Sequence, residues 1–218
     1  MTEWLERHMP KFVMAPSFVA ILIFVYGFIG WTAWVSFTKS RLLPKYDIVG
    51  TIQYDRLFQS PRWETAINNL YVFGILFIVI SMCLGLILAI FLDQKIRVEG
   101  VIRTIYLYPM ALSMIVTGTA WKWILNPGLG IEATVRKWGY ENFTFDWLVN
   151  PDMAIYTVVL AGVWQSSGFV MALFLAGLRS VDEEIIKAAQ VDGIPTWRIY
   201  SAIIIPSMAP IFLSAFIV

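Results

Sequence analysis

Few side chains in this sequence of 218 residues could carry out catalysis or bind a metal ion. Its one histidine, His8, precedes the first long apolar run, and its one cysteine, Cys83, lies inside another. A disulfide framework or a cysteine-based metal site within one chain needs more than one cysteine. A single histidine likewise excludes a two-histidine metal site and a histidine proton relay. We therefore expect no catalytic residue, no metal site and no enzyme activity in this chain.

The most informative polar stretch begins at Ser180 and carries the signals of a short helix. Ser180 with Glu183 three residues later fits a capping box, which starts a helix. Gly193 with Pro195 after it is typical of a helix end. Glu183 also stands four residues before Lys187, in the order that favours an ion pair on a helix. We predict a helix of about three turns here.

One face of this helix is predicted to be small and apolar, formed by Ile185, Ala188 and Ala189. Two interpretations fit. The helix could lie at a membrane surface and simply connect two spans. It could also seat in a cleft of another protein, because alanine lets two backbones approach closely.

The elements that flank this helix are long apolar runs. The chain is 59% hydrophobic and only 14% charged, against about a quarter charged in soluble domains. A helix needs about 20 apolar residues to cross a bilayer. The predicted spans are residues 12–37, 66–92, 104–125, 153–178 and 201–218, joined by a loop at 179–200. We predict an all-α, polytopic transmembrane helical bundle that forms a single domain over residues 1–218.

Prolines mark two of these runs. Pro109 interrupts the third, and Pro206 and Pro210, one turn apart, are expected to kink the start of the fifth. The sequence stops at Val218, inside the fifth run. A polytopic protein rarely ends in mid-span, so we expect four complete spans, a truncated fifth and an incomplete C-terminus. Lysine and arginine are almost evenly divided between the two sets of loops, so they do not set the orientation.

The stretch around Gly193 resembles the EAA loop of binding-protein-dependent ABC importer permeases. That family's pattern is E-A-A, three residues, glycine, nine residues, then I-x-L-P. Ala188, Ala189, Gly193, Ile203 and Pro206 match it at the right spacing. The resemblance implies the fold of an ABC importer permease.

The sequence departs from the family pattern at two positions: Ile205 replaces the leucine and, with more consequence, Lys187 replaces the glutamate. Lysine cannot make the contact of that carboxylate, and Glu184, one turn earlier, is the candidate to supply it. Outside the loop, residues 121–128 and 162–165 resemble the maltose-type sugar permeases. Residues 145–150 and 164–168 are most similar to permeases for glucose or mannose.

The resemblance implies that the chain forms half of a sugar pathway and docks on a cytoplasmic ATPase through residues 179–200. It implies two further partners, a second permease subunit and an extracytoplasmic sugar-binding protein, and no nucleic-acid partner. It places the chain in a bacterial or archaeal cytoplasmic membrane. The N-terminus would be cytoplasmic. Because no G-x-x-x-x-G-K-[ST] motif occurs, ATP and Mg²⁺ would be bound by the ATPase and no cofactor by this chain. The implied coupling residues are Glu184, Ala188, Ala189, Asp192, Gly193 and Pro206.

Uncharged polar residues inside the spans are the candidates for the pathway. Each could instead hydrogen-bond a neighbouring helix. A sugar needs amide and hydroxyl partners and an aromatic face, and adjacent Trp164 and Gln165 supply both an aromatic ring and an amide. Asn69 and Thr117 are the next candidates.

Three other functions fit a polytopic chain. An ion-coupled secondary transporter commonly uses an acidic residue within the membrane, and none of the five runs contains one. A membrane enzyme would need a nucleophile, base or metal ligands that are scarce here. A non-catalytic scaffold subunit is the third alternative.

Overall fold

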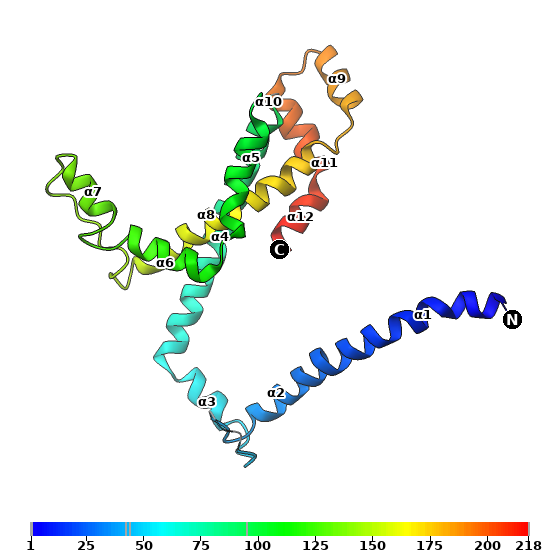
Figure 1. Ribbon diagram of the computed structural model, residues 1–218, viewed down its shortest axis with the longest axis vertical. Coiled ribbons are helices and arrows are strands. Elements are labelled where there is room, and N and C mark those ends of the chain that lie inside the picture. The colour runs from blue at the N-terminus through cyan, green and yellow to red at the C-terminus, as the bar shows by residue number, and fades with distance from the viewer. Residues whose placement is uncertain (1, 42, 44, 95, 218) are drawn as a thin grey trace. The chain divides into compact units, whose positions relative to one another are not determined.

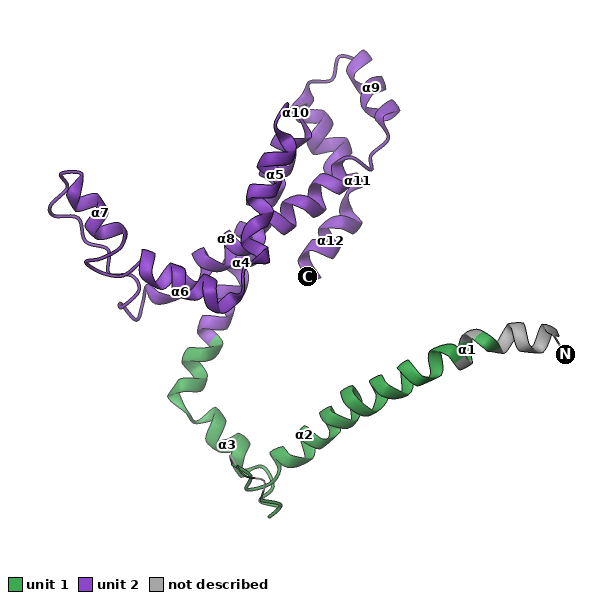
Figure 2. Ribbon diagram, viewed as in Figure 1, with its two compact units in different colours: residues 1–67 green, residues 68–218 purple. Residues whose placement is uncertain are grey.

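The computed structural model describes the backbone of residues 2–41, 43, 45–94 and 96–217, and their side chains apart from those of residues 2–8, 10 and 12. The regular elements of these residues are helices (Figure 1), so the all-α prediction is confirmed. The only strand-like pairing among them is an isolated bridge between Thr38 and Ile48. His8 is among the residues whose side chains are not described. The chain forms two compact units, residues 1–67 and residues 68–218 (Figure 2).

Unit 1 is built around the first apolar run. Its helices are α1 (Thr2–Ile21), the π-helix η1 (Leu22–Gly27), α2 (Phe28–Ser36), α3 (Ile52–Phe58) and the beginning of α4 (Pro61–Asp93). The first three follow one another without a break, and Val13–Ser36, 24 residues long, is long and apolar enough to span a bilayer. Trp31, Trp34 and Tyr46 contact one another near its end, with ring centroids 5.6–6.1 Å apart.

Unit 2 contains the remaining helices. They are the rest of α4, α5 (Glu99–Leu107), the 3₁₀-helix η2 (Tyr108–Ala111), α6 (Met114–Ile124), α7 (Ile131–Lys137), α8 (Ala154–Leu178), α9 (Glu183–Val191), α10 (Thr196–Ile199), the π-helix η3 (Tyr200–Ile204), α11 (Ile205–Ser207) and α12 (Ala209–Ile217). In the described residues, α4, α8 and Val13–Ser36 are long and apolar enough to cross a membrane. The number of candidate membrane spans rises to five if each of two bent helix pairs is counted as one span.

The third predicted span is one of these bent pairs. The chain turns by 100° between Glu99–Ala111 and Met114–Ile124. Pro109 is buried at the turn, and because it lacks a backbone N–H it interrupts the helical hydrogen bonding, as predicted. Leu112 beyond it is extended. Helix α5 begins at Glu99, before the predicted start at residue 104, because a carboxylate in the first turn favours the helix N-terminus although it is not apolar.

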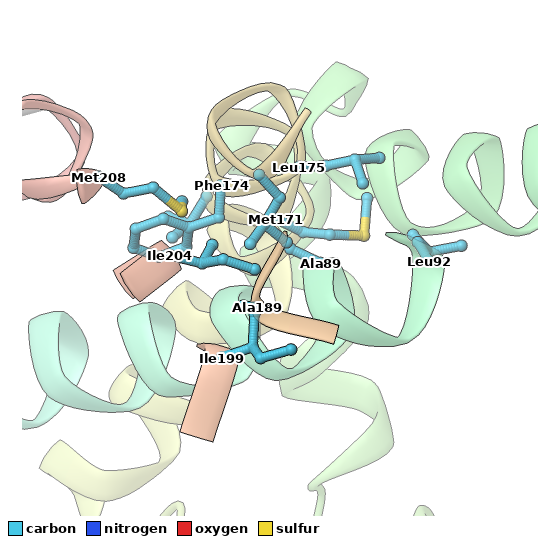
Figure 3. Packing of buried hydrophobic residues seen from close by; sticks show 11 residues of the cluster. Ala89, Leu92, Met171, Phe174, Leu175, Ala189, Ile199, Ile204 and Met208 are labelled. Carbon is cyan, nitrogen blue, oxygen red and sulfur yellow. The ribbon is translucent and has the colours of Figure 1, made fainter. Parts of the chain in front are cut away.

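Helix α8 lies at the centre of unit 2 and contacts α5, η2, α6 and α12. Small residues on α8 allow close approach. A Cβ on Gly168 would lie 1.8 Å from the carbonyl oxygen of Tyr106, so only glycine permits this contact between α8 and α5. Eleven of the buried hydrophobic residues form one cluster, drawn from α4, α8, α9 and the segments from α10 to Met208 (Figure 3): Ala89, Leu92, Val170, Met171, Phe174, Leu175, Leu178, Ala189, Ile199, Ile204 and Met208.

Candidate functional site

Helix α9 begins differently from the prediction. Its N-cap is Asp182, whose Oδ1 accepts a hydrogen bond from the Glu184 backbone N–H at 2.8 Å. The Ser180 hydroxyl donates instead to the carbonyl of Gly177, at 2.7 Å. The predicted capping box from Ser180 to Glu183 is therefore wrong. Ser180 belongs to the turn that closes α8, whereas the Asp182 carboxylate satisfies an otherwise unpaired N–H and carries a favourable negative charge.

The end of α9 is a Schellman motif, which confirms the predicted helix stop. Gly193 has a φ of 73°, a conformation that glycine adopts without steric cost. Its N–H donates to the carbonyl of Gln190, and the N–H of Ile194 donates to that of Ala189, both at 3.1 Å. Both ends of this nine-residue helix therefore have their own hydrogen-bonded caps.

The two sides of α9 have different surroundings. Ala189 is buried in the core cluster, with Ile186 and Ile194 packed against it. The predicted face of Ile185, Ala188 and Ala189 is therefore divided, because Ala189 turns inward. The exposed residues on the other side, hereafter the outer face of α9, are Glu184, Ile185, Ala188, Val191 and Asp192. Val191 is 87% exposed and Ile185 50%, so this face presents apolar surface with a carboxylate at each end.

Lys187 forms an ion pair with Glu183 at 2.9 Å, as its spacing predicts. This hydrogen bond and the charge of Glu183 raise the pKa of Lys187 above its usual 10.5. Glu184 is exposed on the outer face. Its assignment as a substitute for the missing family glutamate stays a prediction.

The segment after α9 bends where the prolines predict. Thr196–Ser207 and Ala209–Ile217 meet at 65°, which confirms the expected kink. Pro206 and Pro210 offer no backbone N–H, so the turns before them cannot close their normal hydrogen bonds. The π-helix η3 directly precedes α11, whose second residue is Pro206.

A cavity of about 750 Å³ lies within unit 2, lined by residues of α4, the Pro109 turn, α6, α8 and α12. Gln165 and Thr117, both predicted pathway residues, line it together with Ser81. The hydroxyl groups of Ser81 and Thr117 are buried and have no hydrogen-bond partner among the described residues. Ser81 was recognised in the sequence only as a polar residue within a span, because no sequence pattern reveals that its hydroxyl lacks a partner.

Apart from Ser166, the rest of the cavity wall is apolar and aromatic. Phe73 and Phe77 of α4 stack with ring centroids 5.3 Å apart, and Phe169 lines the same space. The described residues of the lining include no aspartate, glutamate, lysine, arginine or histidine. Such a cavity can hydrogen-bond and cover an uncharged polar molecule, but it has no group to neutralise a charge.

The structure does not bring the other two predicted pathway residues into this lining. Trp164 packs edge to face against Trp121, with ring centroids 5.8 Å apart, and is 40% exposed. Asn69 is exposed on α4. Along α8, Trp164 lies about 100° from Gln165, on the side turned towards Trp121.

Comparison with known proteins shows to which class this arrangement belongs. Residues 81–218 match the family described as binding-protein-dependent transport system inner membrane component. The chain belongs to this family and is a multi-pass membrane protein.

Two archaeal relatives cover most of the chain. A probable ABC transporter permease of Pyrococcus horikoshii is 40% identical over 207 residues, which are 94% of this chain and 71% of the relative. A xylose/arabinose import permease of Haloferax volcanii is 38% identical over 204 residues, which are 92% of this chain and 64% of that relative. The chain therefore spans about two thirds of the length of these relatives.

The fold is also that of a solved transporter. A crystal structure of a bacterial ABC transporter that imports the acidic polysaccharide alginate aligns with a TM-score of 0.81. The alignment covers 98% of this chain and 73% of that chain, at 20% sequence identity. The predicted fold of an ABC importer permease is therefore confirmed.

Proposed function

We propose that this chain is the permease subunit of an ATP-driven importer of uncharged sugars and forms half of its translocation pathway. Family membership and the names of the relatives, among them the xylose/arabinose permease and a trehalose permease of Mycobacterium tuberculosis, support this function. The proposal includes a second permease subunit, a cytoplasmic ATPase and an extracytoplasmic sugar-binding protein. The solved alginate importer was crystallised with its periplasmic protein, which supports the last of these.

The proposal of uncharged sugars as the substrate rests on the lining of this cavity. Gln165, Thr117 and Ser81 offer an amide and two hydroxyl groups, and Phe73 and Phe77 offer apolar faces. Sugars present hydroxyl groups at their edges and C–H groups on their faces, so this wall complements them. The alginate importer transports an acidic sugar, whereas the described lining here has no cationic side chain that would pair with a carboxylate.

Helix α9 supports the proposed ATPase contact. The caps at Asp182 and Gly193 define its ends, and Ala189 anchors its inner side in the core. The outer face is left to meet a partner. Its apolar centre, Ile185, Ala188 and Val191, matches an apolar groove, and Glu184 and Asp192 would pair with basic side chains at the groove's rim. In this proposal α9 lies in the cytoplasm, which places the N-terminus there too, and the ATPase binds ATP and Mg²⁺.

Transport by the assembled complex tests the proposal. The full-length chain is purified with its partner subunits, reconstituted in proteoliposomes and supplied with the binding protein. We expect uptake of radiolabelled neutral sugars that requires ATP and is unaffected by collapse of ion gradients. Acidic sugars of the same size should not enter. ATP-independent uptake driven by a sodium or proton gradient would support the ion-coupled alternative instead.

A further inference from the structure

Four polar side chains meet at the end of unit 2 where α9 is attached. Asp93 is the last residue of α4, Glu99 the first of α5, Arg179 the C-cap of α8, and Tyr200 the first of η3. Together they are called the polar joint here. Because they lie up to 107 positions apart in sequence, no local pattern brings them together.

Each member of the polar joint connects different helices. The Tyr200 hydroxyl donates to Asp93 Oδ2 at 3.0 Å and accepts from Gln94 Nε2 at 3.4 Å. The Arg179 guanidinium lies 2.8 Å from Glu99 Oε1 and 4.0 Å from Asp93 Oδ1. Asp93 therefore contacts side chains from both the α8 end and the segment after α10.

The polar joint borders the space behind α9. A cavity of about 830 Å³ there is lined by Asp93, Arg179 and Tyr200 on one side and by Glu183 and Lys187 of α9 on another. The attachment of α9 to the rest of unit 2 includes apolar contacts, because Ala189 belongs to the same buried cluster as Ile199 and Ala89 (Figure 3). Apolar contacts are not directional and permit sliding. Hydrogen bonds restrict both distance and angle.

We propose that the polar joint makes α9 and the segment after it move as one body with α4 and α5, so that Asp93 and Tyr200 are positioning residues for transport. Helix α4 carries Phe73, Phe77 and Ser81 into the sugar cavity, so a displacement of α9 reaches the cavity through α4. This inference rests on the proposed function, because it assumes that an ATPase moves α9. The joint itself contacts neither the sugar nor ATP.

The test measures coupling rather than activity alone. Complexes with Tyr200→Phe, Asp93→Asn or both changes are reconstituted, and the sugar transported per ATP hydrolysed is determined together with the amount of ATPase bound. We expect each single variant to lower transport per ATP about ten-fold, the effect of losing a hydrogen bond to a charged group. The double variant should lose less than the two single losses combined, because both changes weaken the hydrogen bond between Tyr200 and Asp93, although Asp93→Asn also weakens the contact with Arg179. ATPase binding should be unchanged.

Tyr106→Phe is the matched control. Its hydroxyl has no hydrogen bond in the described part of the chain, and α5 carries it, so it should retain full coupling. Unchanged transport per ATP in Tyr200→Phe would overturn the inference, as would additive losses in the double variant or loss of ATPase binding. If Asp93→Asn does not fold, Tyr200→Phe alone tests the inference, because it removes only one oxygen atom. If the unaltered complex shows no ATP-driven uptake, the proposed function is wrong, and the positioning role of Asp93 and Tyr200, which depends on it, is wrong too.

Discussion

The side-chain amide of Gln165 donates a hydrogen bond to the backbone carbonyl of Leu112, with 3.1 Å between Nε2 and the oxygen. It fastens α8 to the extended residue that separates η2 from α6. An amide has two donor hydrogens and an acceptor oxygen, so this bond leaves one N–H and the carbonyl oxygen for a molecule in the cavity. Gln165 thus combines a structural contact with the groups that a sugar needs.

Gln165→Met should therefore impair both stability and transport. The change keeps the length of the side chain but leaves the Leu112 carbonyl unpaired, which costs about 1–3 kcal/mol of unfolding free energy. We expect a lower unfolding temperature in detergent and a KM for sugar uptake raised about ten-fold. Gln59→Met, at the exposed C-cap of α3, is the control and should change neither. A normal KM in Gln165→Met would remove Gln165 from the pathway.

Thr117→Val should increase the stability of the protein but lower its transport activity. The hydroxyl of Thr117 is buried without a partner, so replacing it with a methyl group should raise the unfolding free energy by about 1 kcal/mol. Uptake should fall, because the hydroxyl is then missing from the cavity wall. Thr119→Val on the same helix is the control, since its hydroxyl bonds to the Ile115 carbonyl at 2.8 Å and it is exposed. Unchanged uptake in Thr117→Val would show that this hydroxyl does not touch the sugar.

Much of the fold was predictable because it depends on local patterns. The charge-free runs identified the long helices, Pro109 identified the bend, and Gly193 identified the end of α9. The inner side of α9 was not predictable, because Ala188 and Ala189 are identical side chains and only the tertiary packing against the buried cluster distinguishes them.

Contacts between residues distant in sequence could not be predicted either. Nothing in the sequence pairs Tyr200 with Asp93, and nothing distinguishes Ser81 from the other hydroxyl residues of the spans. The cavity was found only in part for the same reason. Adjacency in the sequence does not decide which residues share the cavity: Gln165 lines it with Ser166, whereas Trp164 packs against Trp121 instead.

The N-cap of α9 can be identified by two alanine substitutions. Asp182→Ala removes the acceptor for the Glu184 N–H and should destabilise α9 by about 1 kcal/mol. Ser180→Ala should have little effect on α9, because the Ser180 hydroxyl bonds to Gly177 in the preceding turn. Amide hydrogen exchange of residues 183–191 in the reconstituted chain measures both. Faster exchange in Ser180→Ala but not in Asp182→Ala would restore the capping box.

The ion pair of Lys187 with Glu183 should make α9 insensitive to pH over the physiological range. The folded-state pKa of Lys187 is raised above 10.5, so the stabilisation is fully present below that value and is lost as pH rises through the higher folded value. Hydrogen exchange, corrected for its intrinsic pH dependence, should therefore give the same α9 protection from about pH 6 to about pH 9. A Lys187→Gln chain should lose the alkaline transition. A change in α9 protection near pH 7 would contradict the assignment.

Gly168 should be intolerant of any side chain, because α8 and α5 touch there through the backbone. A Cβ would lie 1.8 Å from the Tyr106 carbonyl oxygen and 2.5 Å from its carbon, and neither atom can turn aside as a flexible side chain would. Gly168→Ala must separate the two helices, and overpacking of this kind costs about 1–3 kcal/mol. Gly100→Ala in α5 meets no atom within 4 Å, so it should be neutral or stabilise slightly through its better helix propensity. Thermal unfolding of the two variants in one detergent compares them directly. Equal unfolding temperatures would mean that α8 and α5 are not in backbone contact at Gly168.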